Sequence, residues 1–118
     1  MKIEQTLKNI FTSGSINAYN LKKPEKCSLP VVVYKRIGRS KISRNFSNNG
    51  DLESVLIRFS VLGDNYSETV QLSEQLETLL DGNKTNFENC SFVGGSENYV
   101  EDTKLNDLVS DYEIINKI

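Results

Sequence analysis

Residues 52–61 have the sequence LESVLIRFSV, in which apolar and polar side chains alternate. Val55, Ile57, Phe59 and Val61 occupy every second position of this segment. Successive side chains of a β-strand point to opposite faces of the sheet, so the alternation predicts a strand with one buried and one exposed face. Strands of this kind are typical of antiparallel sheets.

Two other segments have the periodicity of amphipathic helices. Residues 2–13 and 65–80 each place apolar residues at positions i, i+4, i+7 and i+8, which lie on one face of a helix. These residues are Ile3, Leu7, Ile10 and Phe11 in the first segment and Leu72, Leu76, Leu79 and Leu80 in the second. Asn65 is expected to cap the second helix, and Gly14 and Gly82 are expected to follow the two C-terminal ends.

Further strands are predicted on both sides of the second helix. Residues 30–37 are rich in β-branched side chains, residues 90–93 form a short apolar run before two glycines, and residues 108–115 alternate again. Residues 16–18 are expected to add a short edge strand. The sequence therefore predicts one α+β domain over residues 1–118, with an antiparallel sheet of about four to five strands and two amphipathic helices packed on one face.

Two polar stretches are predicted to be connections. Residues 38–51 contain Asn48, Asn49 and Gly50 and are expected to form a long flexible loop between two strands. Residues 96–104 are acidic and are expected to form a second loop.

Charge is distributed unevenly along the chain, although the net charge is only −2. Residues 22–44 contain eight Lys and Arg and one Glu, whereas residues 64–113 contain twelve acidic residues and two Lys. A basic and an acidic half on one chain can attract further copies of the chain.

Several kinds of reactive site have no support in the sequence. There is no histidine, which removes the commonest general base and the commonest zinc ligand. Cys27 and Cys90 are isolated and are expected to be reduced thiols. The acidic residues Glu97, Glu101 and Asp102 lack the spacing of a calcium loop. We therefore expect no enzyme activity, no metal and no cofactor.

No segment approaches the ~18 apolar residues of a membrane-spanning helix, and residues 2–13 lack the continuous apolar core of a signal peptide. The chain is expected to fold in the cytosol and not to enter a membrane.

The basic segment at residues 34–44 has two interpretations. Its cations are Lys35, Arg36, Arg39, Lys41 and Arg44, and they alternate with apolar residues. On a hairpin they would form a cationic row able to contact a nucleic-acid backbone. Alternatively they face solvent or protein, where charged side chains also discourage unwanted strand pairing. No RNA-recognition or helix-turn-helix signature accompanies the segment.

Four short motifs follow one another in a distinctive order. They are LPVVVY at 29–34, LIRFSV at 56–61, NYSET at 65–69 and LLDG at 79–82. In this order they resemble the tail-completion (tail-terminator) proteins of long-tailed bacteriophages, and the resemblance spans about residues 16–115. The chain departs from the family's pattern at Leu56 and Arg58, where Gln and Asp are usual, and at Thr69, where Ala is usual.

The resemblance implies a virion protein without catalytic residues. It implies a homo-oligomeric, hexameric ring that caps the head-proximal end of the tail tube, stops tube elongation and joins the tail to the head–neck connector. A related neck or head-closure protein, or a small nucleic-acid-binding module, remains an alternative. Assembly would take place in the host cytoplasm, and passing DNA could contact the ring.

The charge pattern suggests which residues such a ring would use. Candidate residues for a subunit or tube interface, or for the lumen, are Lys35, Arg36, Arg39, Lys41, Arg44 and Arg58. Candidate residues for an acidic counter-surface are Glu97, Glu101, Asp102, Asp107 and Asp111.

Overall fold

The computed structural model describes residues 3–14, 16–20, 29–42, 52–84 and 87–117, and it has the predicted α+β fold. Its seven elements, in chain order, are α1 (Ile3–Ser13), β1 (Ala18–Asn20), β2 (Val31–Ile42), β3 (Leu52–Gly63), α2 (Tyr66–Leu80), β4 (Asn89–Val100) and β5 (Leu105–Lys117).

The alternating segment predicted from the sequence becomes the central strand of the sheet. The five strands lie in the order β1-β2-β3-β5-β4. β3 pairs antiparallel with β2 on one side and with β5 on the other, and β4 pairs antiparallel with β5. β1 is parallel to β2 and covers only Val32–Tyr34 of it.

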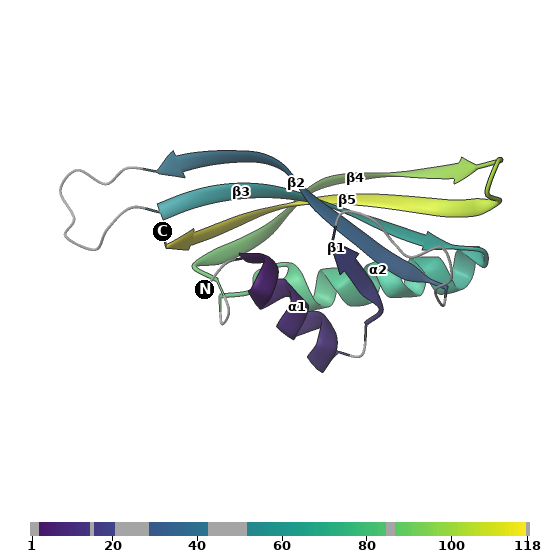
Figure 1. Cartoon of the computed structure of the whole chain (residues 1–118), viewed down its shortest axis with the longest axis horizontal. Coiled ribbons are helices and arrows are strands. Elements are labelled where there is room, and N and C mark those ends of the chain that lie inside the picture. The colour runs from purple at the N-terminus through teal and green to yellow at the C-terminus, as the bar shows by residue number, and fades with distance from the viewer. Residues whose placement is uncertain (1–2, 15, 21–28, 43–51, 85–86, 118) are drawn as a thin grey trace.

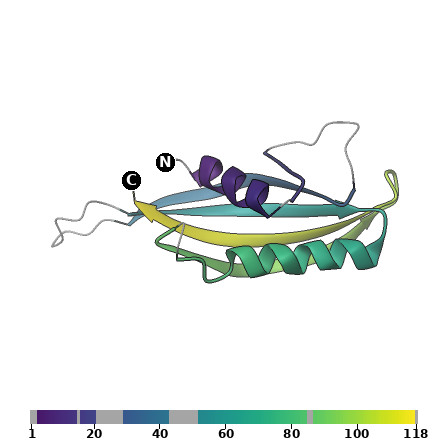
Figure 2. The same ribbon diagram turned by 90° about the horizontal axis from the view of Figure 1, so that it is seen from below.

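Both helices lie on one face of the sheet, as predicted (Figures 1 and 2). Ile3, Leu7 and Phe11 of α1 join Leu76 and Leu80 of α2 in a single buried core. The apolar residues that recur with the helical period are therefore the ones that pack into the core, and the polar side of each helix faces water.

An aromatic cluster at the centre of the core ties α1 to the sheet. The fully buried ring of Phe59 lies 5.4–6.0 Å, between ring centroids, from the rings of Phe11, Tyr34 and Tyr112. Two of these contacts, those with Phe11 and Tyr112, are edge-to-face. Such pairs contribute about 0.5–1.5 kcal/mol each beyond the burial of apolar area.

The predicted helix ends are also present. The Asn65 side chain accepts a hydrogen bond from the Glu68 N–H and so caps α2, while Gly82 follows the helix with a φ of +75°. Glycine adopts this left-handed conformation without the steric penalty of other residues. Both helix ends depend on residues within a few positions of the end, and the sequence alone could therefore predict them.

The molecule is elongated, with extents of 52 × 25 × 23 Å. Its radius of gyration is 15.2 Å, above the ~13.5 Å expected for a compact domain of this length. Two β-hairpin arms produce the length, since β2 and β3 extend to one end and β4 and β5 to the other (Figure 1).

The structure corrects the predicted start of the first connection. β2 does not end at Ile37 but continues through Gly38 to Ile42, with an irregularity in register between Arg36 and Gly38. The glycine therefore lies at a β-bulge rather than in a loop. The rest of the predicted loop, residues 43–51, lies outside the described residues.

The second predicted loop is wrong for most of its length. β4 continues through Gly94 and Gly95 to Val100, and only residues 101–104 form the turn to β5. Again the glycines accompany a bulge, between Phe92 and Gly94. All residues from Gly95 to Val100 are exposed, so this part of the strand has no apolar–polar alternation by which to predict it.

Candidate assembly surfaces

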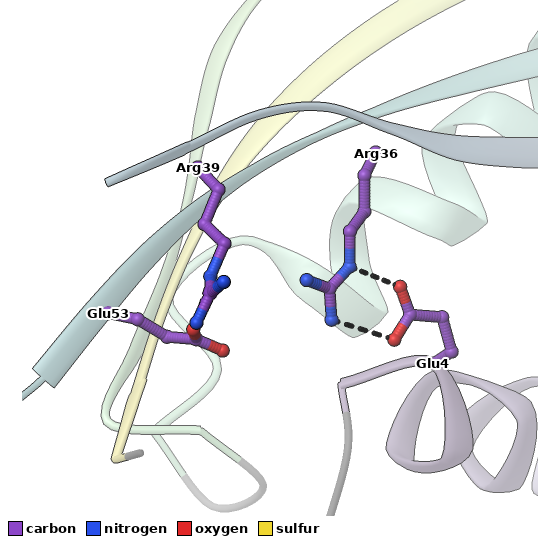
Figure 3. A network of polar contacts seen from close by, with 4 residues as sticks. All are labelled: Glu4, Arg36, Arg39 and Glu53. Atoms are coloured by element: carbon purple, nitrogen blue, oxygen red, sulfur yellow. Dashed lines mark hydrogen bonds and ion pairs between the residues drawn. The ribbon is translucent and has the colours of Figure 1, made fainter. Parts of the chain in front are cut away.

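Two of the predicted basic residues make ion pairs on the helix-bearing face of the sheet. Arg36 donates two hydrogen bonds to the Glu4 carboxylate of α1, one of them from Nη2 to Oε1 at 2.9 Å. Arg39 donates from Nε to Glu53 Oε2 of the neighbouring strand at 2.8 Å. Figure 3 shows both guanidinium groups pointing to the side on which α1 lies. The hydrogen bonds to Glu4 raise the pKa of Arg36.

Arg58 forms a third pair on the opposite, helix-free face. It makes a bidentate contact with Asp111 of β5, with Nε–Oδ1 at 2.9 Å and Nη2–Oδ2 at 3.1 Å. This pair joins a residue from the predicted basic set to one from the predicted acidic set within one chain. The roles of Arg58 at a subunit or tube interface or in the lumen, and of Asp111 on an acidic counter-surface, stay predictions.

The other predicted basic residues differ in how far they are described. Lys35 is exposed on β2. Lys41 belongs to the β2 backbone and pairs in register with Glu53, while its side chain, like the whole of Arg44, lies outside the described part of the structure. The predicted cationic row is therefore partly neutralised by carboxylates of the same chain.

The predicted acidic residues separate into two environments. Glu97 is exposed on β4 and accepts a hydrogen bond of 2.6 Å from the hydroxyl of Tyr66, at the start of α2. This contact raises the pKa of the Tyr66 hydroxyl. Glu101 and Asp102 are exposed in the turn between β4 and β5.

Asp107 is half-buried on β5, and burial raises the pKa of its carboxyl group despite an opposing hydrogen bond with Ser60. Among the described residues, its Oδ1 is a buried side-chain oxygen without a hydrogen-bond partner. An unsatisfied carboxylate oxygen costs stability when the group is charged.

β4 presents an edge that sequence analysis missed. Asp81 and Gly82 cover the outer side of the first half of β4. The Gly82 N–H donates to the Cys90 carbonyl, and the Phe92 N–H donates to Asp81 Oδ1. Beyond Phe92, β5 is the only strand paired with β4 in the described sheet. We call residues Gly94–Val100 the acidic edge, because Glu97 is the one charged residue within it.

Large apolar side chains are exposed along and beside this edge. Val93 is 59% exposed, Tyr99 57%, Phe92 43% and Val100 39%. Long exposed edge strands with apolar side chains favour pairing with another chain, and proteins usually protect them with Lys, Pro or a covering element. The available sequence signal for this edge is the apolar pair Tyr99-Val100, which lies between acidic residues in the segment predicted to be a loop.

An open hollow of about 530 Å³ lies beside the acidic edge. Glu77 of α2, Glu97 of β4 and the ring of Phe92 contribute to its wall. Two carboxylates next to an aromatic ring suit a guanidinium or ammonium group.

Three observations concern metal-binding, nucleophilic and membrane-spanning residues. No group of three or more His, Cys, Asp or Glu among them is arranged to hold a metal ion. The Cys90 thiol is buried, and burial together with the nearby Asp81 raises its pKa to about 12, so the nucleophilic thiolate is disfavoured. No helix in the described ranges is long and apolar enough to cross a membrane.

Comparison with known proteins connects the fold to one kind of particle. No protein-family model matches the chain, and no curated protein matches its sequence. A solved structure described as "Virion of native gene transfer agent (GTA) particle" contains a chain of similar fold, with a TM-score of 0.63 and 11% sequence identity. The match covers 95% of this chain and 89% of that chain. At this identity the likeness concerns the fold, and it extends over almost the whole of both chains.

Proposed function

We propose that this protein is a structural component of a phage-like virion, and specifically a tail-completion protein. In this role, six copies form a ring on the head-proximal end of the tail tube, stop tube elongation and provide the surface that binds the head–neck connector. The ring works through shape and charge, without enzymatic chemistry, in the virion after assembly in the host cytoplasm.

The fold it shares with a virion chain is the observation that carries this proposal. The similarity covers both chains nearly end to end, so it involves the arrangement of all elements rather than one common hairpin. The motifs at residues 29–34, 56–61, 65–69 and 79–82 independently resemble the tail-completion family. The elongated subunit, with an outer edge of β4 that no other strand of the described sheet covers, also suits a component that acts by assembling.

Particles assembled with and without this chain provide the test. We expect labelled protein to be seen in electron micrographs at the junction of head and tail, in a ring at the end of the tube. Without the chain, we expect free heads together with tails of uncontrolled length. Headless tails of normal length would instead favour the alternative of a neck or head-closure protein, and intact particles would contradict both roles.

The nucleic-acid alternative is weakened by the ion pairs of the basic segment. Arg36, Arg39 and Arg58 each contact a carboxylate of the same chain, which lowers the positive charge available to phosphates. A nucleic-acid-binding module would show affinity for DNA that falls steeply with salt. We expect no such binding at low salt, and steep salt-dependent binding would favour the alternative.

A further inference from the structure

We propose that the acidic edge of one copy pairs with the β2 edge of the next copy, so that the sheet continues from subunit to subunit. This inference rests on the proposed function, because it names the contact that would build the ring. Its occupant is a second copy of this chain. The β2 edge comprises residues Lys35–Ser40, which lie beyond the part of β2 covered by β1.

The two edges are complementary in position. They lie on opposite sides of the sheet, at β2 and β4, and at opposite ends of the long axis (Figure 1). The lengths without a second strand partner in the described sheet are similar, six residues in Lys35–Ser40 and seven in Gly94–Val100. When copies are placed end to end, the acidic edge of each copy therefore lies against the β2 edge of its neighbour.

The two edges are also complementary in direction. β2 is antiparallel to β3, β3 to β5, and β5 to β4, so β2 and β4 run in opposite directions. A second copy in the same orientation presents its β2 antiparallel to the first copy's β4. The helices of both copies then lie on the same face of the continued sheet. Such a head-to-tail contact is heterologous, and it closes a ring when the rotation between copies allows it.

Charge distinguishes this pairing from the like-with-like alternatives. Lys35, Arg36 and Arg39 lie on the β2 edge. Glu4 and Glu53 pair with the two arginines, but the charge of Lys35 leaves the edge positive, so two β2 edges repel each other. The acidic edge has no cation, and Glu97 would face a second Glu97 or its near neighbours in a β4–β4 pair. Pairing β2 with β4 is the combination in which the charges attract.

The open hollow gives the pairing a specific contact. Glu97 is in register with Leu108, and Arg39 with Val55, and both apolar partners belong to the core beneath the helices. Glu97 and Arg39 therefore project from the same face of a continued sheet. Arg39, whose side chain is about half exposed (51%) in its pair with Glu53, can reach the hollow walled by Glu77, Glu97 and Phe92 of the next copy.

The first experiment measures self-association of the full chain by analytical ultracentrifugation. We expect Glu97→Arg to raise the dissociation constant about tenfold or more, because it places like charges at the junction. Glu74→Arg makes the same charge change on exposed α2, and Tyr66→Phe removes the hydrogen bond to Glu97 without a charge change. Both controls should stay within about twofold of the parent. An equal effect of Glu74→Arg would contradict the proposed edge.

Mixing variants tests the pairing of edges directly. Arg39→Glu alone should also weaken association, whereas an equimolar mixture of Arg39→Glu and Glu97→Arg restores attraction at every junction of an alternating ring. Circular dichroism confirms that each variant is folded. Failure of two folded variants to associate in the mixture would count against the contact.

Cross-linking through one exposed thiol in each variant, with Cys90 buried in the core, decides between arrangements. Ser40→Cys and Asn98→Cys, each in a Cys27→Ser background, place exposed thiols on the two edges. A short bis-maleimide should link the two variants when mixed, in concentrated protein or in particles, but neither variant to itself. Self-linking of Asn98→Cys would show a two-fold β4–β4 contact and overturn the proposal, as would the absence of any link in both preparations.

Failure of the edge pairing and failure of the proposed function give different results. A ring at the tail end without the mixed cross-link would refute the edge pairing and retain the function. The mixed cross-link in a protein that is absent from the head–tail junction would retain the edge pairing and refute the proposed function.

Discussion

Two adjacent glycines of β4 should respond in opposite ways to the same substitution. A Cβ atom added at Gly95 would lie 2.6 Å from the Val109 carbonyl oxygen of β5, closer than such atoms approach in proteins. The obstacle is backbone, so relief requires β4 and β5 to separate. At Gly94, an added Cβ meets no heavy atom within 4 Å. The close approach of β4 and β5 therefore requires a glycine at position 95, but it does not require one at position 94.

The magnitudes follow from these two environments. Overpacking of this kind costs about 1–3 kcal/mol. Replacing glycine by alanine also lowers the entropy of the unfolded chain, which stabilises the fold by about 0.4–1 kcal/mol where the backbone permits. We expect Gly95→Ala to lower the free energy of unfolding by about 1–2 kcal/mol, or about 4–8 °C in Tm. Gly94→Ala should be neutral or stabilise by up to about 1 kcal/mol.

Urea unfolding followed by circular dichroism measures both variants against the parent, and equal m-values would show that the same surface is exposed on unfolding. If Gly94→Ala destabilised the protein as much as Gly95→Ala, the strand approach at Val109 would not be the reason for the glycine. The β4–β5 arm carries the acidic edge, so Gly95→Ala should also weaken self-association, whereas Gly94→Ala should weaken it less.

Three further predictions concern single contacts. Burial raises the pKa of Asp107, so its charged form destabilises the fold; Asp107→Asn should therefore stabilise at pH 7 but not below the unfolded carboxyl's pKa of about 4, as measured by urea unfolding at both values. The exposed pair of Glu4 and Arg36 should give a coupling of about 0.2–1 kcal/mol in a double-mutant cycle of alanine variants, and 1 M NaCl should reduce that coupling. Asn65→Ala should cost about 1 kcal/mol in thermal unfolding through loss of the α2 cap, whereas Asn65→Asp should retain most of the stability.

The core of the fold was predictable because burial imposes a period on the sequence. The alternation in β3 and the helical spacing in α1 and α2 predicted three elements and their buried faces. The caps at Asn65 and Gly82 were predictable for a related reason, since a helix end needs a particular side chain within a few residues.

The ends of β2 and β4 were not predictable in the same way. Beyond Arg36 and Phe92, these strands project along the arms, where fewer side chains are buried. Without a buried face, a strand has no alternation, and its glycines and polar residues resemble those of a loop. What keeps these segments extended is backbone pairing with β3 and β5, and pairing leaves little trace in the local sequence.

The candidate surfaces also depend on which strands pair with one another, and the local sequence does not reveal this pairing. Whether a strand lies at an edge depends on its position in the strand order. In the order β1-β2-β3-β5-β4, the last strand in the chain, β5, lies between β3 and β4, so that β4 is at the edge. Had β4 paired with β3, Glu97 and Tyr99 would lie in the interior of the sheet. The separation of basic and acidic residues along the chain acquires its physical meaning only from this order. It places Lys35 and Arg39 at one edge and Glu97 at the other, where charges that are apart in one subunit can meet between two.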